Sequence, residues 1–246
     1  MQVPTAAQKT RLRNSLALTL PALIFGFLVA AQWQTQSERS QLAVRYNAPL
    51  TEAAQSLQNE QNGLKEQLAS LRAELDKIQK SASSQSGAAR DLQAQIDRLR
   101  DLAGLTPVTG DGVMVLLDDA KGTSATAKDL DKSICHATDL TDILNTAWRG
   151  GAEAAAINGE RIVGTSSVYC VGSTIMVNGT LMSPPFNFAV VGRQDQLMSA
   201  FADPEQLKDI KQRRDVHGLG FRVTRASGVT VPAYRGALNV RYGQGY

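Results

Sequence analysis

Two pairs of neighbouring residues after residue 104 carry side chains typical of catalytic or metal-binding sites. Cys135 and His136 resemble a nucleophile and its base, but adjacent residues rarely direct their side chains at each other. Asp118 and Asp119 follow an apolar run, where paired carboxylates bind a cation or act as acid and base. Polar residues at the end of a strand are, however, far commoner. Because neither pair is a complete catalytic set, the sequence predicts that the protein is not an enzyme.

Cys135 and Cys170 are the two cysteines of the chain. An even number of cysteines in an oxidising compartment favours a disulfide, so we predict a structural Cys135–Cys170 bond. Two buried free thiols are the alternative. The spacing of these cysteines and the two histidines matches no zinc site, and no phosphate-binding loop or G-x-S-x-G turn is present. We therefore expect no metal, no cofactor and no catalytic residues.

Asn158, Arg161, Pro184 and Pro185 form the candidate interaction surface. Asn158 is followed by glycine, which is the standard signal for a type I′ hairpin turn, so a turn with one solvated arginine is the alternative. Pro184 and Pro185 follow Ser183 in a second loop. A cleft between this loop and the Asp118–Asp119 pair would suit a ligand-binding or hydrolytic protein.

The elements that must position these residues are short strands and two helices. An apolar run predicts a central strand at Val113–Leu117. A helix follows, with Thr138 as its N-cap, apolar residues at i, i+3, i+4 and i+7, and Gly150 at its end. Asp203–Pro204–Glu205 predicts the start of another helix. The strand predictions are completed by Ala152–Ile157, Thr174–Val177, the run from Phe186 to Val191, and a closing hairpin of Phe221–Arg225 and Val229–Val231 turning at Ser227–Gly228. Asn178–Gly179 predicts a second Asn-Gly turn, which links Thr174–Val177 to the strand after it. The order predicts a ferredoxin-like α+β sandwich with extra hairpins over residues 105–246.

Residues 34–104 precede this domain and contain a heptad repeat. Charges of opposite sign flank the seam in the order that suits a parallel pair, so we predict a parallel coiled-coil dimer. Residues 81–89 are a predicted soft point, because they offer small or polar seam residues and the helix-weakening Gly87. A single solvated helix that packs on its own domain is the alternative. The apolar seam consists of Leu57, Leu64, Leu68, Leu71, Leu75, Ile78, Leu92, Ile96 and Leu99.

An uncharged apolar segment at residues 14–33 predicts a transmembrane helix. Lys9, Arg11 and Arg13 precede it and account for the net charge of +3, since acids and bases balance in the rest of the chain. A basic tail stays cytoplasmic, so residues 1–13 should lie inside and everything after Trp33 outside. A cleaved signal peptide is the alternative, and it would also export the rest of the chain.

Short motifs in the C-terminal half of the chain are typical of one bacterial family. They are Asp139–Leu140, Ala147–Trp148, Gly151–Ala152–Glu153–Ala154, Ile157–Asn158–Gly159–Glu160–Arg161, Ser166–Ser167, Cys170–Val171–Gly172, Ile175–Met176–Val177–Asn178–Gly179 and Pro184–Pro185–Phe186. On these residues the chain resembles the bacterial proteins grouped as domain of unknown function 881, some of which are labelled division initiation proteins of Gram-positive bacteria. The family implies a membrane-anchored coiled coil that carries an external α+β domain of no established activity, so no catalytic residue is carried over.

Two functions fit these observations. The first is a single-pass plasma-membrane protein that dimerises through its coiled coil and presents the α+β domain to an unidentified cell-envelope or division protein. The second is a ligand-binding or hydrolytic domain that acts on cell-wall material. A nucleic-acid partner is not expected, because the exported region has no cluster of Lys and Arg with interleaved aromatic residues.

Overall fold

The computed structural model describes residues 25–27, 52–82, 87–121 and 131–238. The chain divides into two compact units at residues 60 and 61. In the first unit, residues 25–27 and 52–60 are helical. The second unit holds the rest of helix 52–82, helix α2 (Gly87–Leu102) and an α+β domain, and the predicted α+β class is confirmed.

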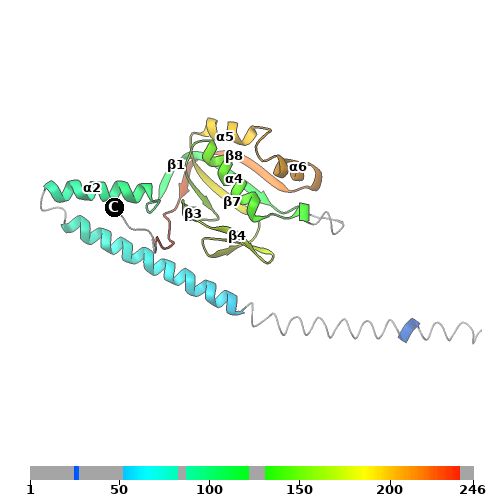
Figure 1. Ribbon diagram of the computed structural model, residues 1–246, viewed down its shortest axis with the longest axis horizontal. Helices are drawn as coiled ribbons and strands as arrows, with labels where there is room; N and C mark the ends of the chain where they lie inside the picture. Colours follow the sequence, from blue (N-terminus) through cyan, green and yellow to red (C-terminus); the bar gives the residue numbers. More distant parts are fainter. Residues whose placement is uncertain (1–24, 28–51, 83–86, 122–130, 239–246) are drawn as a thin grey trace, which may run out of the picture. The chain divides into compact units, whose positions relative to one another are not determined.

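A five-stranded sheet with the order β3-β2-β7-β1-β8 forms the centre of the α+β domain (Figure 1). Every neighbouring pair is antiparallel, so β1 and β2 run parallel to each other with β7 between them. The predicted central strand at 113–117 is confirmed, because it lies within β1, and the predicted strand at 152–157 has the observed bounds of β2. The strands are β1 (Val108–Asp118), β2 (Ala152–Ile157), β3 (Glu160–Ile162), β7 (Phe186–Gly192) and β8 (Gly220–Val231).

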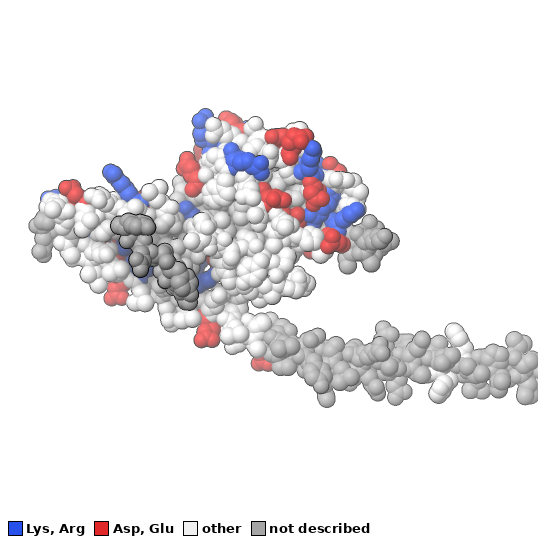
Figure 2. All heavy atoms as spheres, in the orientation of Figure 1, with Lys and Arg blue, Asp and Glu red and all other residues white. Residues whose placement is uncertain are grey.

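Three helices cover one face of this sheet: α4 (Ala137–Arg149), α5 (Gln194–Ala202) and α6 (Lys208–His217). Figure 2 shows acidic and basic side chains mixed on the outer surface over α5 and α6. Alternate residues of the strands point toward the helices, as expected for a sheet with two different faces. The largest core side chains, Phe186 and Phe188, are fully buried in this layer. The opposite face packs small residues, namely Ala154, Ala156, Val191, Val229 and Val231.

A second, three-stranded antiparallel sheet is inserted between β3 and β7. It consists of β4 (Val168–Val171), β5 (Thr174–Val177) and β6 (Thr180–Met182). Both predicted Asn-Gly turns join paired strands and have the left-handed backbone of a type I′ turn. The φ angles are 45° and 84° at Asn158 and Gly159, and 51° and 80° at Asn178 and Gly179. These two hairpin predictions are confirmed.

Three local predictions are wrong. Helix α4 has His136, not Thr138, as its N-cap, and the Asp139 carboxylate accepts the His136 backbone N–H at 2.8 Å. The chain forms helix α5 before residue 203, and residues 204–207 are a turn that precedes α6. The closing hairpin is one continuous strand, β8, because a bulge opposite β1 absorbs the glycine at position 228.

Residues 61–82 and helix α2 lie side by side, as Figure 1 shows in cyan and green. The Arg100 guanidinium forms an ion pair with Asp76 and donates to Gln79 at 2.9 Å. Contacts over 24 residues of sequence are incompatible with one straight helix through both segments, which would separate these residues by about 36 Å. The two segments therefore do not form one straight helix, and the residues between them lie within the range 81–89 that the sequence predicts as a soft point.

The predicted transmembrane segment 14–33 and basic tail 1–13 lie outside the described residues, apart from residues 25–27. Within the described part of the chain, every helix is too short or too polar to cross a bilayer.

The predicted disulfide is not formed, and both cysteines are free thiols. Cys135 lies half-buried just before α4, where its backbone N–H donates to Asp119 at 2.7 Å. Cys170 is exposed on β4, in the three-stranded sheet. The Cys135 thiol is thus enclosed beside Asp119, whereas the Cys170 thiol is open to solvent on β4. An even number of cysteines, on which the prediction rested, carries no information about whether the fold brings the two sulfur atoms together.

Candidate functional site

The predicted seam residues of helix 52–82 are open to solvent. Five of them are half or more exposed: Leu57, Leu64, Leu71, Leu75 and Ile78. Leu68 is half-buried. A row of large apolar side chains without cover is unusual on a soluble surface and marks an interaction site. We call Leu64, Leu71, Leu75 and Ile78, which lie in the second unit, the leucine face.

The helix contacts the α+β domain through a polar edge instead of the leucine face. The Lys65 ammonium binds the Glu160 carboxylate at 3.0 Å and the Thr180 hydroxyl at 2.7 Å. Two turns beyond, the Arg72 guanidinium donates to the carbonyl oxygens of Tyr234 and Gly236 at 3.2 and 3.1 Å. Lys65 and Arg72 occupy the same position of successive heptads, so this edge is directed inward and leaves the leucine face uncovered.

Helix α2 repeats this arrangement. Leu92 and Leu99, the seam residues on the same heptad position as Leu64 and Leu71, are exposed. Gln93 and Arg100 follow them directly in sequence and are covered by the rest of the chain, Gln93 being buried. Ile96 is half-buried. In both helices, therefore, a polar edge makes the contacts within the chain, and the leucines that recur every seven residues stay exposed to solvent.

Only some of the residues predicted to form the interaction surface lie together. Asn158 is exposed, its amide donates to the Pro185 carbonyl at 3.2 Å, and its side-chain oxygen accepts the Asn187 N–H at 2.8 Å. Pro184 is half-buried beside Pro185 in the same loop. Arg161 is not part of this surface, because it is only 6% exposed. It points instead to the sheet face that packs Ala154 and Ala156.

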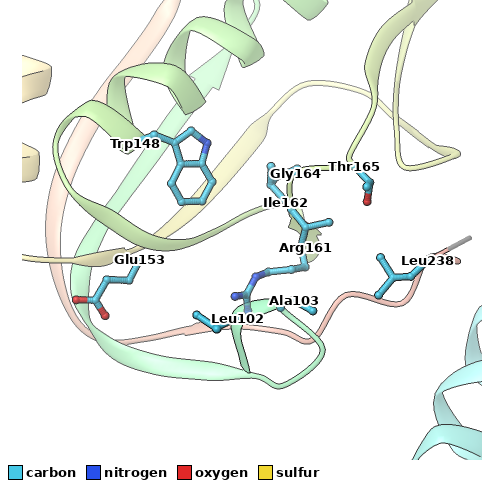
Figure 3. A pocket seen from close by; sticks show the side chains of 11 residues that line it. Leu102, Ala103, Trp148, Glu153, Arg161, Ile162, Gly164, Thr165 and Leu238 are labelled. Atoms are coloured by element: carbon cyan, nitrogen blue, oxygen red, sulfur yellow. The ribbon is translucent and has the colours of Figure 1, made fainter. Parts of the chain in front are cut away.

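Arg161 lines a pocket of about 440 Å³ beside the junction of α2 and β1 (Figure 3). Its Nη1 donates to two carbonyl oxygens, those of Thr106 and Pro232, at 3.3 and 3.2 Å. Its Nε is buried and has no partner within the described residues. Burial lowers the pKa of Arg161 from its usual value. A buried guanidinium that meets carbonyl groups but no carboxylate is an incompletely satisfied cation.

Arg213 is a second buried arginine of the same domain, and carboxylates compensate its charge. Its Nη1 contacts the Asp139 carboxylate at 2.7 Å and the Asp209 carboxylate at 3.0 Å. Its Nε donates to the Lys132 carbonyl at 3.1 Å. Burial lowers the pKa of Arg213, but Asp139 and Asp209 outweigh it and raise that pKa overall. This pair is therefore a structural support that ties α6 to the start of α4.

The predicted acid–base pair has local structural partners. The Asp118 carboxylate accepts the Asp119 N–H at 3.0 Å and pairs with Lys121 at 3.4 Å. Asp119 accepts the backbone N–H of Cys135. The sheet register places Asp118 at the same end as Pro185, since Leu117 pairs with Phe186. Neither residue lines the pocket at Arg161.

The thiol of Cys135 is poorly suited to nucleophilic attack. Burial and then the neighbouring Asp119 carboxylate raise its pKa far above the usual range for a cysteine. The reactive thiolate is thus scarce at neutral pH. Within the described residues, no group of three or more His, Cys, Asp or Glu side chains is arranged to hold a metal ion.

The burial of Arg161 was the main site feature that the sequence interpretation missed, although a signal was present. The Asn158–Gly159 turn fixes the register of its hairpin, which pairs Ile157 with Glu160 and Ala156 with Arg161. Ala156 belongs to a run of small apolar residues typical of a closely packed face. Since cross-strand partners point to the same face, Arg161 should have been expected there.

The family described as "Bacterial protein of unknown function (DUF881)" matches residues 95–244 of the chain. This range contains the whole α+β domain and the second half of α2. Uncharacterised proteins of two bacterial genera are also similar to the chain. UPF0749 protein Rv1823 of Mycobacterium tuberculosis is 27% identical over 228 residues, which are 89% of this chain and 72% of that protein. UPF0749 protein YlxX of Bacillus subtilis is 21% identical over 93% of this chain and 95% of its own length.

One solved structure is similar as well, and its title describes an uncharacterized conserved protein from Mycobacterium tuberculosis. It is 25% identical, covers 62% of this chain and 99% of its own, and superposes with a TM-score of 0.48.

Proposed function

The chain belongs to the DUF881 family of bacterial proteins, and from this premise we propose that it is a membrane-anchored interaction protein of the cell envelope. Residues 14–33 would anchor it with the N-terminus in the cytoplasm. Helix 52–82 would join two copies, and the α+β domain would meet a cell-envelope or division protein outside. The uncharged apolar segment and the basic tail before it support this topology.

The single observation that carries the proposal is the uncovered leucine face. The helix directs Lys65 and Arg72 toward its own domain and leaves Leu64 and Leu71 exposed to water. In a single copy of the chain this apolar face is not buried. A heptad repeat normally buries these positions against another helix. A second copy of this chain is the partner that fits best, because copies anchored in one membrane present the same stripe in parallel. The dimer would form while the polar edge keeps its contacts with the domain.

We propose a ferredoxin-like arrangement for the α+β domain itself. The order β2-β7-β1-β8, with an antiparallel strand inserted between two parallel ones, supports it. The three-stranded sheet and β3 would then be additions on one side of that core.

Cysteine crosslinking in cells tests the proposed dimer. Leu71→Cys and Ala73→Cys would be compared in a Cys170→Ser background, which removes the exposed native thiol. A parallel, in-register pair brings residue 71 of both copies to the seam and holds residue 73 on the outer face. We expect mild oxidation to convert Leu71→Cys, but not Ala73→Cys, to a covalent dimer.

A matched pair of charge variants makes the test independent of oxidation. Leu64→Lys with Leu71→Lys adds two positive charges to the leucine face, whereas Ser70→Lys with Ala73→Lys adds the same charges to the exposed back of the helix. Only the first variant should sediment as a monomer. Equal crosslinking at residues 71 and 73, or a dimer that survives both lysines at the seam, would contradict the proposal.

A further inference from the structure

We propose that the pocket at Arg161 binds a small organic carboxylate, with the acid group on the guanidinium and an apolar body between Trp148 and Leu102. This site is independent of the proposed dimer. It stands on an unpaired buried cation, a cavity of about 440 Å³ and the side chains that surround it.

The charge of Arg161 is not compensated by the described part of the chain. Nine-tenths or more of the side chain is buried, and within the described residues it forms no ion pair. Among the described residues, the acceptors of Arg161 are bonded to Nη1 alone, so Nη2 has no hydrogen bond to any of them. A guanidinium presents its donors as a planar fork that matches a carboxylate. An anion in the pocket would complete the coordination that the fold leaves open.

The Arg161 guanidinium lies inside the pocket. Figure 3 shows the Arg161 side chain extending through the pocket toward Leu102, with Trp148 and Glu153 nearby. Gly104 lies directly beneath it, and a Cβ atom there would be 3.5 Å from both Nε and Nη2 and 2.7 Å from Val163. Gly104 has a φ of 72°, which L-residues rarely adopt. The fold thus keeps this position bare and lets the backbone pass close to the guanidinium.

The other side chains that line the pocket determine which anion fits. Trp148 is 39% exposed and offers an indole wall, and Leu102 and Leu238 add apolar surface. Glu153 also lines the pocket, so a second negative charge on the ligand would be repelled. The arrangement therefore favours a singly charged carboxylate with an apolar body over a phosphate or phosphonate dianion.

Three probes with the same phenyl ring separate these features: benzoate, the neutral benzamide and phenylphosphonate. Their binding to the full chain in detergent would be titrated by saturation-transfer NMR. We expect benzoate to bind at least about tenfold more tightly than benzamide, which corresponds to one charge-assisted hydrogen-bonding interaction. Phenylphosphonate should bind more weakly than benzoate. Equal binding of benzoate and benzamide, or no transfer to benzoate, would overturn the proposal.

Variants assign the binding to this pocket. Arg161→Gln should abolish the preference for benzoate over benzamide. Arg235→Gln removes the same charge from an exposed arginine that does not line the pocket, and it should change nothing.

Arg161→Gln also removes the hydrogen bonds to Thr106 and Pro232, so its effect is not specific to ligand binding. Glu153→Gln, which changes an exposed residue of the same pocket, is therefore a second test. Glu153→Gln should tighten phenylphosphonate binding several-fold and benzoate binding less. If it affects neither probe, the pocket is not the anion site.

Discussion

Asp139 stabilises both the start of α4 and the contact between α4 and α6. Its carboxylate caps the start of α4 and also neutralises Arg213, whose side chain is 7% exposed. Removing one partner of a buried pair leaves the other charge without compensation. We therefore expect Asp139→Asn to lower the free energy of unfolding by about 3–5 kcal/mol, measured by urea denaturation of the full chain.

Asp209→Asn is the matched control, because it removes the other carboxylate from the same arginine. The Asp209 side chain is 76% exposed, so water screens and replaces its interaction. The loss should be about 1 kcal/mol or less. Similar losses for the two variants would show that Arg213 does not depend on Asp139 in the way the geometry indicates.

The two cysteines should differ in reactivity, not form a bond. Cys170 is exposed, whereas burial and Asp119 raise the pKa of the Cys135 thiol. Alkylation of the native, non-reduced protein with iodoacetamide at about pH 8 should label Cys170 quickly and Cys135 only after unfolding. Peptide mass spectrometry measures both sites. Finding neither site labelled without reductant, even in denaturant, would restore the disulfide predicted from the sequence.

At the scale of elements, Gly112 is a position in β1 where β7 leaves no room for a side chain. A Cβ atom at this position would lie 1.9 Å from the Val190 carbonyl oxygen, so the backbone of the sheet would have to move. We expect Gly112→Ala to destabilise the domain by about 3 kcal/mol or more. The thermal midpoint of the full chain, followed by circular dichroism, checks this.

Gly63→Ala is the control for Gly112→Ala. Gly63 lies within helix 52–82, and nothing lies within 4 Å of an added Cβ atom. The substitution should raise helix stability by about 0.5–1 kcal/mol through the higher helix propensity of alanine. A loss of stability at both glycines would argue against the observed close approach of the two strands.

Elements with a complete local signal could be predicted from the sequence. The alanine-rich strand β2 and both Asn-Gly hairpins were correct, because a tight turn fixes where each strand ends and how it pairs. The strand β8 was divided in error at Gly228, since a glycine at positive φ serves equally as a turn or as a bulge. Only the continuous partner strand β1 distinguishes these outcomes, and a partner more than 110 residues away leaves no local signal.

The candidate site was predictable to a smaller degree. The seven-residue spacing predicts the seam leucines, and the Asn158–Gly159 turn predicts the hairpin that carries Arg161. That Arg161 is buried without a carboxylate depends on the positions of Gly104 and Pro232, which are distant in sequence. The ion pair of Asp139 with Arg213 joins residues 74 apart and has the same cause.

At the scale of the whole molecule, the orientation across the membrane is the property to test. Alkaline phosphatase fused to the C-terminus is active only where its disulfides form, so the proposed topology predicts activity. Replacing Lys9, Arg11 and Arg13 with glutamate should reduce it, because the basic tail directs the insertion. The same fusion without residues 1–33 provides the cytoplasmic control. An inactive full-length fusion that is made in normal amounts would contradict the export of the domain.

The attachment of helix 52–82 also has a mechanical consequence. Lys65 and Arg72 hold the helix to the domain through charge-assisted hydrogen bonds at separate points, whereas β1 is held along its length by ladders on both sides. A pull transmitted from a bilayer to residue 61 would load these point contacts first. The protein would then lengthen in one reversible step, with its β-sheet still folded, before any strand is drawn apart.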